Sequence, residues 1–273
     1  MYLLYCDESN VEEREGDFLL YAGVSIPPST AKQLSDEIEL IRKRASVPDD
    51  FRLKFNPGPP HLSHQEFIAL KKAILESAVA NGVRLFAYVI LHDVAKGKGM
   101  DVARRNGINT VCFHFDCYLN RVKDQGIVLL DRFQDRGNRI DDHTREKFSI
   151  GLVGLPYSPT KRLSNILGVH YSTVGQSHFC SLVDIIVGSL RFSINSYSRG
   201  QTEFHESAAE ILNVLSPLFF REEGWDGVSE LGLQFSPKVV RKNAFRAKYA
   251  GLKQFLADRG VDTVQRITNQ REY

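Results

Sequence analysis

The sequence lacks the features of a secreted, zinc-bound or membrane-inserted protein. Its 273 residues include four cysteines and no CxxC pair, which indicates neither a disulfide framework nor a zinc ribbon. No apolar run approaches the roughly 18–20 residues that a membrane helix needs, and the N-terminus has no basic region followed by a long apolar one. We therefore expect a cytoplasmic protein that does not enter a membrane.

The net charge is also small, at +2, but the charges are unevenly distributed. Ser236–Phe255 contains several lysines and arginines and no acid. This pattern predicts a basic helix from Ser236 to about Arg259, which could lie along a phosphate backbone. A solvated helix whose Lys and Arg side chains cover apolar neighbours explains the pattern equally well.

The order of apolar segments predicts alternating strands and helices. Residues 1–6 and 18–25, joined by an acidic stretch, predict an antiparallel hairpin. Ser63 and Glu66 match the capping-box pattern at the start of a helix. Further strands are predicted at 52–55, 83–91, 126–131 and 166–171, and helices at about 30–46, 63–81, 101–123, 141–155, 176–197 and 206–220. The pattern favours an α/β domain with a mixed sheet over residues 1–197, followed by a mainly helical, basic extension over 198–273 that is either separate or packed on the same domain.

Three carboxylates lie where apolar segments make a charge costly. Asp7 and Asp131 each end an apolar strand, and Asp184 interrupts the apolar helix predicted at 176–197. An ionised carboxylate beside a dry core is destabilising unless it is paired, hydrogen-bonded or bound to a cation. If the two strands are parallel neighbours, both acids lie at one edge of the sheet, where a crossing helix could add the third. Three hard oxygen ligands favour Mg²⁺ or Mn²⁺ over zinc.

Each acid also has an ordinary structural interpretation. Asp7 could simply end a strand, Asp131 could pair with Arg132, and Asp184 could cap a helix or form an internal salt bridge. Glu8 follows Asp7 and would face the opposite side of an ideal strand, so we rank it as an auxiliary.

Other polar residues near these segments are weaker candidates. His92 and Asp93 end another apolar strand, where a turn role is favoured. His170, Ser172 and Ser177 precede or begin the helix of the third acid and could position water or phosphate. Ser177 is more simply a helix-start residue.

At the three acids the chain resembles the DUF3800-type domain family, a large family of prokaryotic proteins with a ribonuclease H-like fold. In that family the first strand ends in Asp-Glu-Ser followed by Gly, and this chain has YCDESN, with Asn10 at the glycine position. A later strand ending in Asp is similar to IVLLDRF, and an apolar helix is similar to SLVDIIVG. Many members carry Glu-x-Lys on a strand between them, where this chain has Arg52 and Lys54.

The resemblance covers about residues 1–197. It implies a ribonuclease H-like three-layer fold, with a mixed central sheet flanked by helices. Enzymes with this fold hydrolyse or transfer phosphodiesters with two divalent ions. Arg52 in place of the glutamate puts a fourth acidic ligand in doubt.

The leading hypothesis is a divalent-metal-dependent nuclease that hydrolyses DNA or RNA by a two-metal-ion mechanism. Asp7, Asp131 and Asp184 would bind Mg²⁺ or Mn²⁺, and Glu8 would orient water or act as a further ligand. The predicted nucleic-acid contacts are Lys54, Lys96, Lys98, Arg104, Arg105, Lys238, Arg241, Lys242 and Arg246. One rival is a catalytically inactive ribonuclease H-like module that binds nucleic acid or a partner protein. Another is a hydrolase acting on a small phosphorylated molecule.

Overall fold

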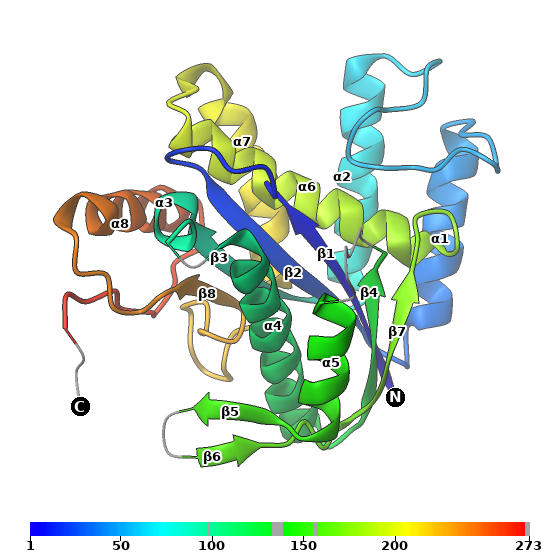
Figure 1. Cartoon of the computed structure of the whole chain (residues 1–273). Coiled ribbons are helices and arrows are strands. Elements are labelled where there is room, and N and C mark those ends of the chain that lie inside the picture. Colours follow the sequence, from blue (N-terminus) through cyan, green and yellow to red (C-terminus); the bar gives the residue numbers. More distant parts are fainter. Residues whose placement is uncertain (98, 133–138, 156–157, 271–273) are drawn as a thin grey trace.

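A mixed β-sheet separates two layers of helices (Figure 1). The computed structural model describes residues 1–97, 99–132, 139–155 and 158–270. The strands of the sheet are β1 Tyr2–Ser9, β2 Phe18–Ile26, β3 Arg84–Leu91, β4 Gly126–Asp131, β7 Ile166–Ser172 and β8 Leu233–Ser236. A separate hairpin consists of β5 Leu152–Leu155 and β6 Ser158–Lys161.

The strands of the sheet lie in the order β7-β4-β1-β2-β3-β8. β1 is parallel to β4, and β4 is parallel to β7. β2 is antiparallel to both of its neighbours, β1 and β3, whereas β8 is parallel to β3. The predicted opening hairpin and the predicted mixed α/β sheet are therefore confirmed.

The helices are α1 Ala31–Arg44, α2 His64–Ala80, α3 His92–Ala95, α4 Met100–Val122, α5 Arg139–Ser149, α6 His178–Ser198, α7 His205–Leu215 and α8 Asn243–Ala257, with short 3₁₀ turns at Thr202–Phe204 and Ser216–Leu218. The capping box predicted at Ser63 and Glu66 is present at the start of α2. Helices α1, α2, α6, α7 and α8 pack on one core cluster, and α4 and α5 contribute to the other.

Alternation along β1 assigns its side chains to the two faces. Leu4 and Cys6 belong to the core that includes α4, whereas Tyr5 belongs to the core that includes α6. Because successive side chains of a strand point to opposite faces, Asp7 follows Tyr5 onto the α6 face. Glu8 follows Cys6 onto the α4 face.

Three predicted elements differ from the structure. The segment 52–55 is not a strand, because the Phe55 backbone bonds to side chains of α6 and α2 instead of to a sheet. The helix predicted to continue to residue 155 ends at Ser149, and Gly151, at φ +111°, separates it from β5. The basic helix starts only at Asn243, because Ser236 is still part of β8.

The C-terminal residues pack on the same layers as the rest of the chain. β8 pairs with β3, and Tyr249 and Leu252 of α8 are fully buried in the core cluster that also contains residues of α6. Of the helices in the described ranges, only α6 has the length and composition to cross a membrane. In this structure 78% of its most apolar stretch is buried inside the protein, as is typical of a core helix.

Candidate metal centre

Asp7 and Asp131 lie side by side where the parallel pairing of β1 with β4 ends. The register of β1 and β4 pairs Cys6 with Leu130, so the two aspartates occupy the next matching positions. Neighbouring strands are about 4.8 Å apart, and matching residues of parallel strands share a face. Ser172 of β7 is paired with Asp131 in the same way and is buried. The sequence-based condition for two converging acids is therefore met.

Asp184 reaches the same face from α6, which packs across β1 and β2. Its Oδ2 accepts a 2.6 Å hydrogen bond from the Phe55 backbone N–H. Oδ1 of Asp7 accepts a 2.7 Å hydrogen bond from the Glu8 N–H. These backbone donors fix one oxygen of each carboxylate.

The electrostatics of Asp7 indicate that the three carboxylates share one region. Burial, together with the negative charges of Asp131 and Asp184, raises the pKa of Asp7 to about 7, against the lowering effect of the Glu8 N–H. Burial also raises the pKa of Asp131, whereas the Arg132 N–H and the positive charge of Lys54 lower it. A cation among these groups would relieve the repulsion, because a nearby positive charge favours the ionised form.

Glu8 lies on the other face of the sheet, paired with Arg104 of α4. The Arg104 Nε donates to Glu8 Oε2 at 2.7 Å, and its NH2 group donates to Oε1. Both side chains are mostly buried, at 16% and 17% exposure. Such a bidentate ion pair is geometrically specific. The structure thus holds Glu8 away from the face that carries Asp7, although its charge still raises the pKa of Asp7 and Asp131.

Of the predicted phosphate contacts, Lys54 is the one that the structure places beside the carboxylates, since its charge acts on Asp131. Lys96 pairs with Glu13 at 2.9 Å, and Arg104 pairs with Glu8. Lys98 lies outside the described residues.

The remaining basic candidates belong to other surfaces. Lys238 pairs with Glu230, Lys242 lies over the Phe245 ring, and Arg246 donates to the Val240 carbonyl at 2.9 Å. Arg105 is partly buried and donates to the Asp101 carbonyl at 3.4 Å, and Arg241 is exposed.

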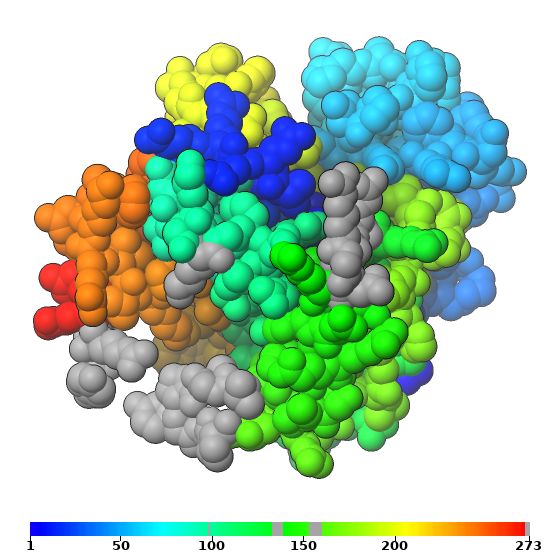
Figure 2. Space-filling view, in the orientation of Figure 1, coloured from blue at the N-terminus to red at the C-terminus, as the bar shows by residue number. Residues whose placement is uncertain are grey.

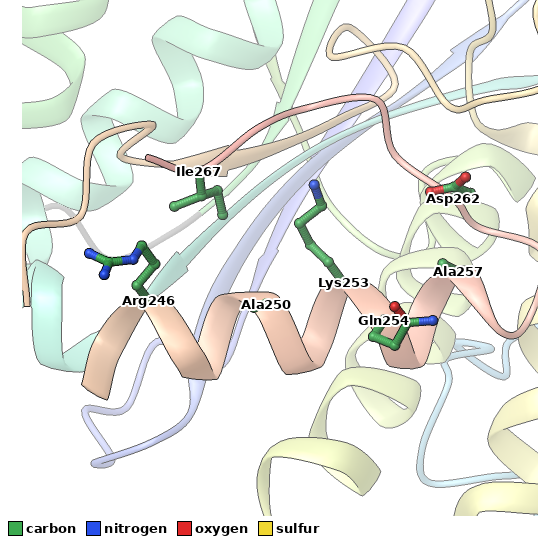
Figure 3. A pocket seen from close by; sticks show the side chains of 7 residues that line it. All are labelled: Arg246, Ala250, Lys253, Gln254, Ala257, Asp262 and Ile267. Carbon is green, nitrogen blue, oxygen red and sulfur yellow. The ribbon is translucent and has the colours of Figure 1, made fainter. Parts of the chain in front are cut away.

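A pocket of about 310 Å³ lies between α8 and the C-terminal residues (Figure 3). Its lining includes none of the three aspartates. It is lined by Arg246, Lys253 and Asp262, among others. Lys253 donates to the Gln265 carbonyl, so both basic side chains of the lining are engaged within the protein.

His92 and Asp93 hold the loop between β1 and β2. The His92 Nδ1 accepts the Arg14 N–H at 2.8 Å, and Asp93 accepts the Gly16 N–H at 2.9 Å. Asp93 also pairs with Lys248 of α8 at 3.3 Å. The pair, which begins helix α3, thus has structural contacts to the β1–β2 loop and to α8.

The polar residues around the start of α6 have different positions. Ser177 is the N-cap of α6 and accepts the Cys180 N–H, as predicted. His170 is exposed on β7. Ser172 is paired with Asp131 in the sheet, so it is the residue of this group that lies beside an acid.

Sequence patterns did not identify Phe55 and Lys71 as neighbours of the site. The Phe55 N–H bonds to Asp184, and the Phe55 carbonyl accepts from Lys71 Nζ at 3.4 Å. The only available signal was the position of Phe55 next to Lys54. An irregular segment whose backbone bonds to a side chain 129 positions away has no sequence periodicity that would reveal this contact.

The donor chemistry of the three aspartates fits a hard divalent cation, since all are carboxylates and two have raised pKa values. Within the described ranges, no three His, Cys, Asp or Glu side chains are already grouped as a metal-binding set. The carboxylates therefore share a face and an electrostatic environment without a preformed coordination shell.

In comparisons with known proteins, no family model matches the chain, and no curated protein matches it.

Proposed function

We propose that the chain is a divalent-metal-dependent nuclease that hydrolyses phosphodiester bonds of DNA or RNA. The observation that carries this proposal is the placement of Asp7 and Asp131 at matching positions of the parallel strands β1 and β4, with Asp184 close enough for its charge to act on both. Carboxylates gathered on one face at the ends of parallel strands suit the binding of a ligand there.

The architecture supports a ribonuclease H-like core as part of the proposal. A mixed sheet flanked by helices carries the three acids in the order strand, strand, helix. The same order underlies the resemblance to the DUF3800-type family. Asn10, at the family's glycine position, has φ +57°, which is the left-handed geometry that glycine and asparagine tolerate.

The chain's own residues would bind and orient the reacting groups. Asp7, Asp131 and Asp184 would hold Mg²⁺ or Mn²⁺, which in a two-metal site activates water and stabilises the departing oxygen. The Phe55 N–H orients the Asp184 carboxylate. Lys54, beside Asp131, would contact a substrate phosphate.

The test is cleavage of labelled single- and double-stranded DNA and RNA with Mn²⁺. We expect Mn²⁺-dependent cleavage by the wild type, and a loss of about 100-fold or more in Asp131→Asn, because losing a ligand removes several kcal/mol of charge stabilisation. Asp36→Asn is the matched control, since Asp36 forms an exposed pair with Lys32 on α1. Circular dichroism would show that each variant is folded. Absence of cleavage, or a wild-type rate in Asp131→Asn, would contradict the proposal.

The second candidate is a catalytically inactive ribonuclease H-like module that binds nucleic acid or a partner protein. Arg52 favours it, because this exposed arginine stands where the family has an acid and its side chain lies beside Gly175. Salt-dependent association with nucleic acid, without turnover under any divalent ion, would support this function over the first.

A further inference from the structure

Three phenylalanine rings extend from the carboxylates toward α7, and we name them the aromatic track: Phe55, Phe192 and Phe204. The ring centroids of Phe55 and Phe192 are 6.5 Å apart, and those of Phe192 and Phe204 are 5.8 Å apart. Phe204 is 39% exposed, and Phe55 and Phe192 are half-buried. The three rings therefore form a continuous apolar strip that reaches solvent.

Helix α6 joins this strip to the candidate metal centre. Asp184, Gly188 and Phe192 are spaced four residues apart, so they form one row along the helix. Phe55 fits against Gly188, where an added Cβ would lie 2.4 Å from the Phe55 Cβ. At 1.5 Å per residue, the row covers about 12 Å. The Phe55 N–H at one end of the track is the donor to Asp184.

Positive side chains accompany the rings. Lys71 Nζ lies 4.2 Å from the centroid of Phe55 and 4.3 Å from that of Phe67, and the Arg191 guanidinium carbon lies 5.6 Å from Phe55. Among the described residues, no carboxylate forms a salt bridge with Lys71 or Arg191. Neither charge is therefore neutralised by a carboxylate of these residues, in contrast to that of Arg104, which is paired with Glu8.

The segments that carry the two outer rings are separated at the surface (Figure 2). Figure 2 shows a hollow between the light-blue and cyan segment around residues 50–75 and the yellow segment around residues 200–210. Phe55 belongs to the first segment and Phe204 to the second, and Phe192 lies within ring contact of both. The track therefore joins these two segments through Phe192.

Rings with adjacent cations are suited to unpaired bases. A base exposes its faces for stacking in a single strand, whereas in a duplex they are covered by neighbouring base pairs, and Lys and Arg bind the phosphates between stacked bases. We propose that the aromatic track binds a single-stranded segment of nucleic acid and leads its backbone to Asp7, Asp131 and Asp184. This inference rests on the proposed function and specifies its substrate as single-stranded.

The test is fluorescence anisotropy with labelled single-stranded DNA and RNA and the corresponding duplexes, in EDTA so that divalent ions do not contribute. We expect the wild type to bind a single strand at least about tenfold more tightly than a duplex. Phe204→Ala should weaken single-strand binding about tenfold, which is typical for the loss of one stacking ring. The matched control is Trp225→Ala, which removes a 64% exposed aromatic ring elsewhere.

The cation is tested by the salt dependence of binding. Lys71→Gln should reduce the slope of log affinity against log salt by about 0.7, the value for one phosphate of a single strand. Lys72→Gln, the exposed neighbour on α2 that pairs with Glu76, should leave the slope unchanged. Equal affinity for single strand and duplex, or equal losses in Phe204→Ala and Trp225→Ala, would overturn the inference.

Binding and cleavage separate this inference from the proposed function. Single-strand binding with the expected variant effects, but without Mn²⁺-dependent cleavage, would support the track and contradict the nuclease. Cleavage that Asp131→Asn abolishes but Phe204→Ala leaves unchanged on single strands would support the nuclease and contradict the track.

Discussion

Asn10 fixes the end of β1 with both its backbone and its side chain. Its backbone is left-handed, and its Nδ2 donates to the Phe18 carbonyl at 2.9 Å and to Asn195 Oδ1 at 2.7 Å. Glycine would allow the same backbone but would form neither bond. Since Asn195 is on α6, this residue connects the strand that bears Asp7 to the helix that bears Asp184. Asn10 thus closes the turn and adds a tether between two elements that carry the candidate metal ligands.

The face of β1 on which Glu8 lies determines its partner. Strand alternation predicts that Glu8 faces away from Asp7, and in the structure it lies on the α4 face, paired with Arg104. Its effect on the candidate metal ligands is therefore electrostatic: its negative charge raises the pKa of Asp7 and of Asp131.

His114 of α4 predicts a pH dependence of stability. Burial lowers its pKa to about 4, although its hydrogen bonds to the Leu231 carbonyl and Gln234 act in the other direction. An unfolded histidine has a pKa near 6.5. Between about pH 6.5 and pH 4 the unfolded chain binds a proton that the folded chain does not, so the free energy of unfolding falls as the pH falls.

The expected loss from this group between pH 7 and pH 5 is about 2 kcal/mol. His114→Gln removes the titrating group, so its free energy of unfolding should fall by about that much less over the same interval. Urea denaturation of both proteins at the two pH values measures the difference. Identical pH dependence in the two proteins would contradict the buried, neutral state of His114.

At the scale of elements, the irregular segment 52–55 is held by helices instead of by a sheet. Its Phe55 backbone bonds to Asp184 of α6 and Lys71 of α2, and its ring packs on Gly188. The segment therefore links α2, through Lys71, to the Asp184 carboxylate of the candidate metal centre.

Gly188→Ala tests this arrangement. In a helix alanine is favoured over glycine by about 1 kcal/mol, but here its Cβ would meet Phe55 and displace the segment. We expect an unchanged far-UV circular dichroism spectrum with Mn²⁺ affinity and cleavage each about tenfold lower, because Asp184 loses its orienting donor. Ser189→Ala, which adds no atom on this helix, is the control. Wild-type Mn²⁺ affinity and cleavage in Gly188→Ala would show that the segment does not orient Asp184.

Elements with local signals could be predicted, and elements with distant partners could not. Ser63 and Glu66 indicate the start of α2 because both halves of the capping box lie within four residues. By contrast, Ser236 looked like the start of a helix, and it is the end of β8 because of its pairing with Ile90 of β3. Local composition does not contain such a pairing.

At the scale of the whole molecule, the sheet brings together acids that are far apart in the sequence. The meeting of Asp7 and Asp131 was predictable, because each directly follows an apolar run of strand length, and the carboxyl ends of such runs meet if the strands are parallel neighbours. The Arg104 pairing and the aromatic track were not predictable, since they depend on how α4, α2 and α6 pack against the sheet. Helix α8 completes the same core from the C-terminal side.

The most direct test of the candidate metal centre is anomalous X-ray diffraction from crystals of the full chain soaked in Mn²⁺. We expect Mn²⁺ between Asp7, Asp131 and Asp184, with carboxylate oxygens at roughly 2.0–2.3 Å, and no Mn²⁺ there in crystals of Asp131→Asn. Carboxylates that stay apart with no Mn²⁺ between them in the soaked wild-type crystal would contradict the site and, with it, the proposed mechanism.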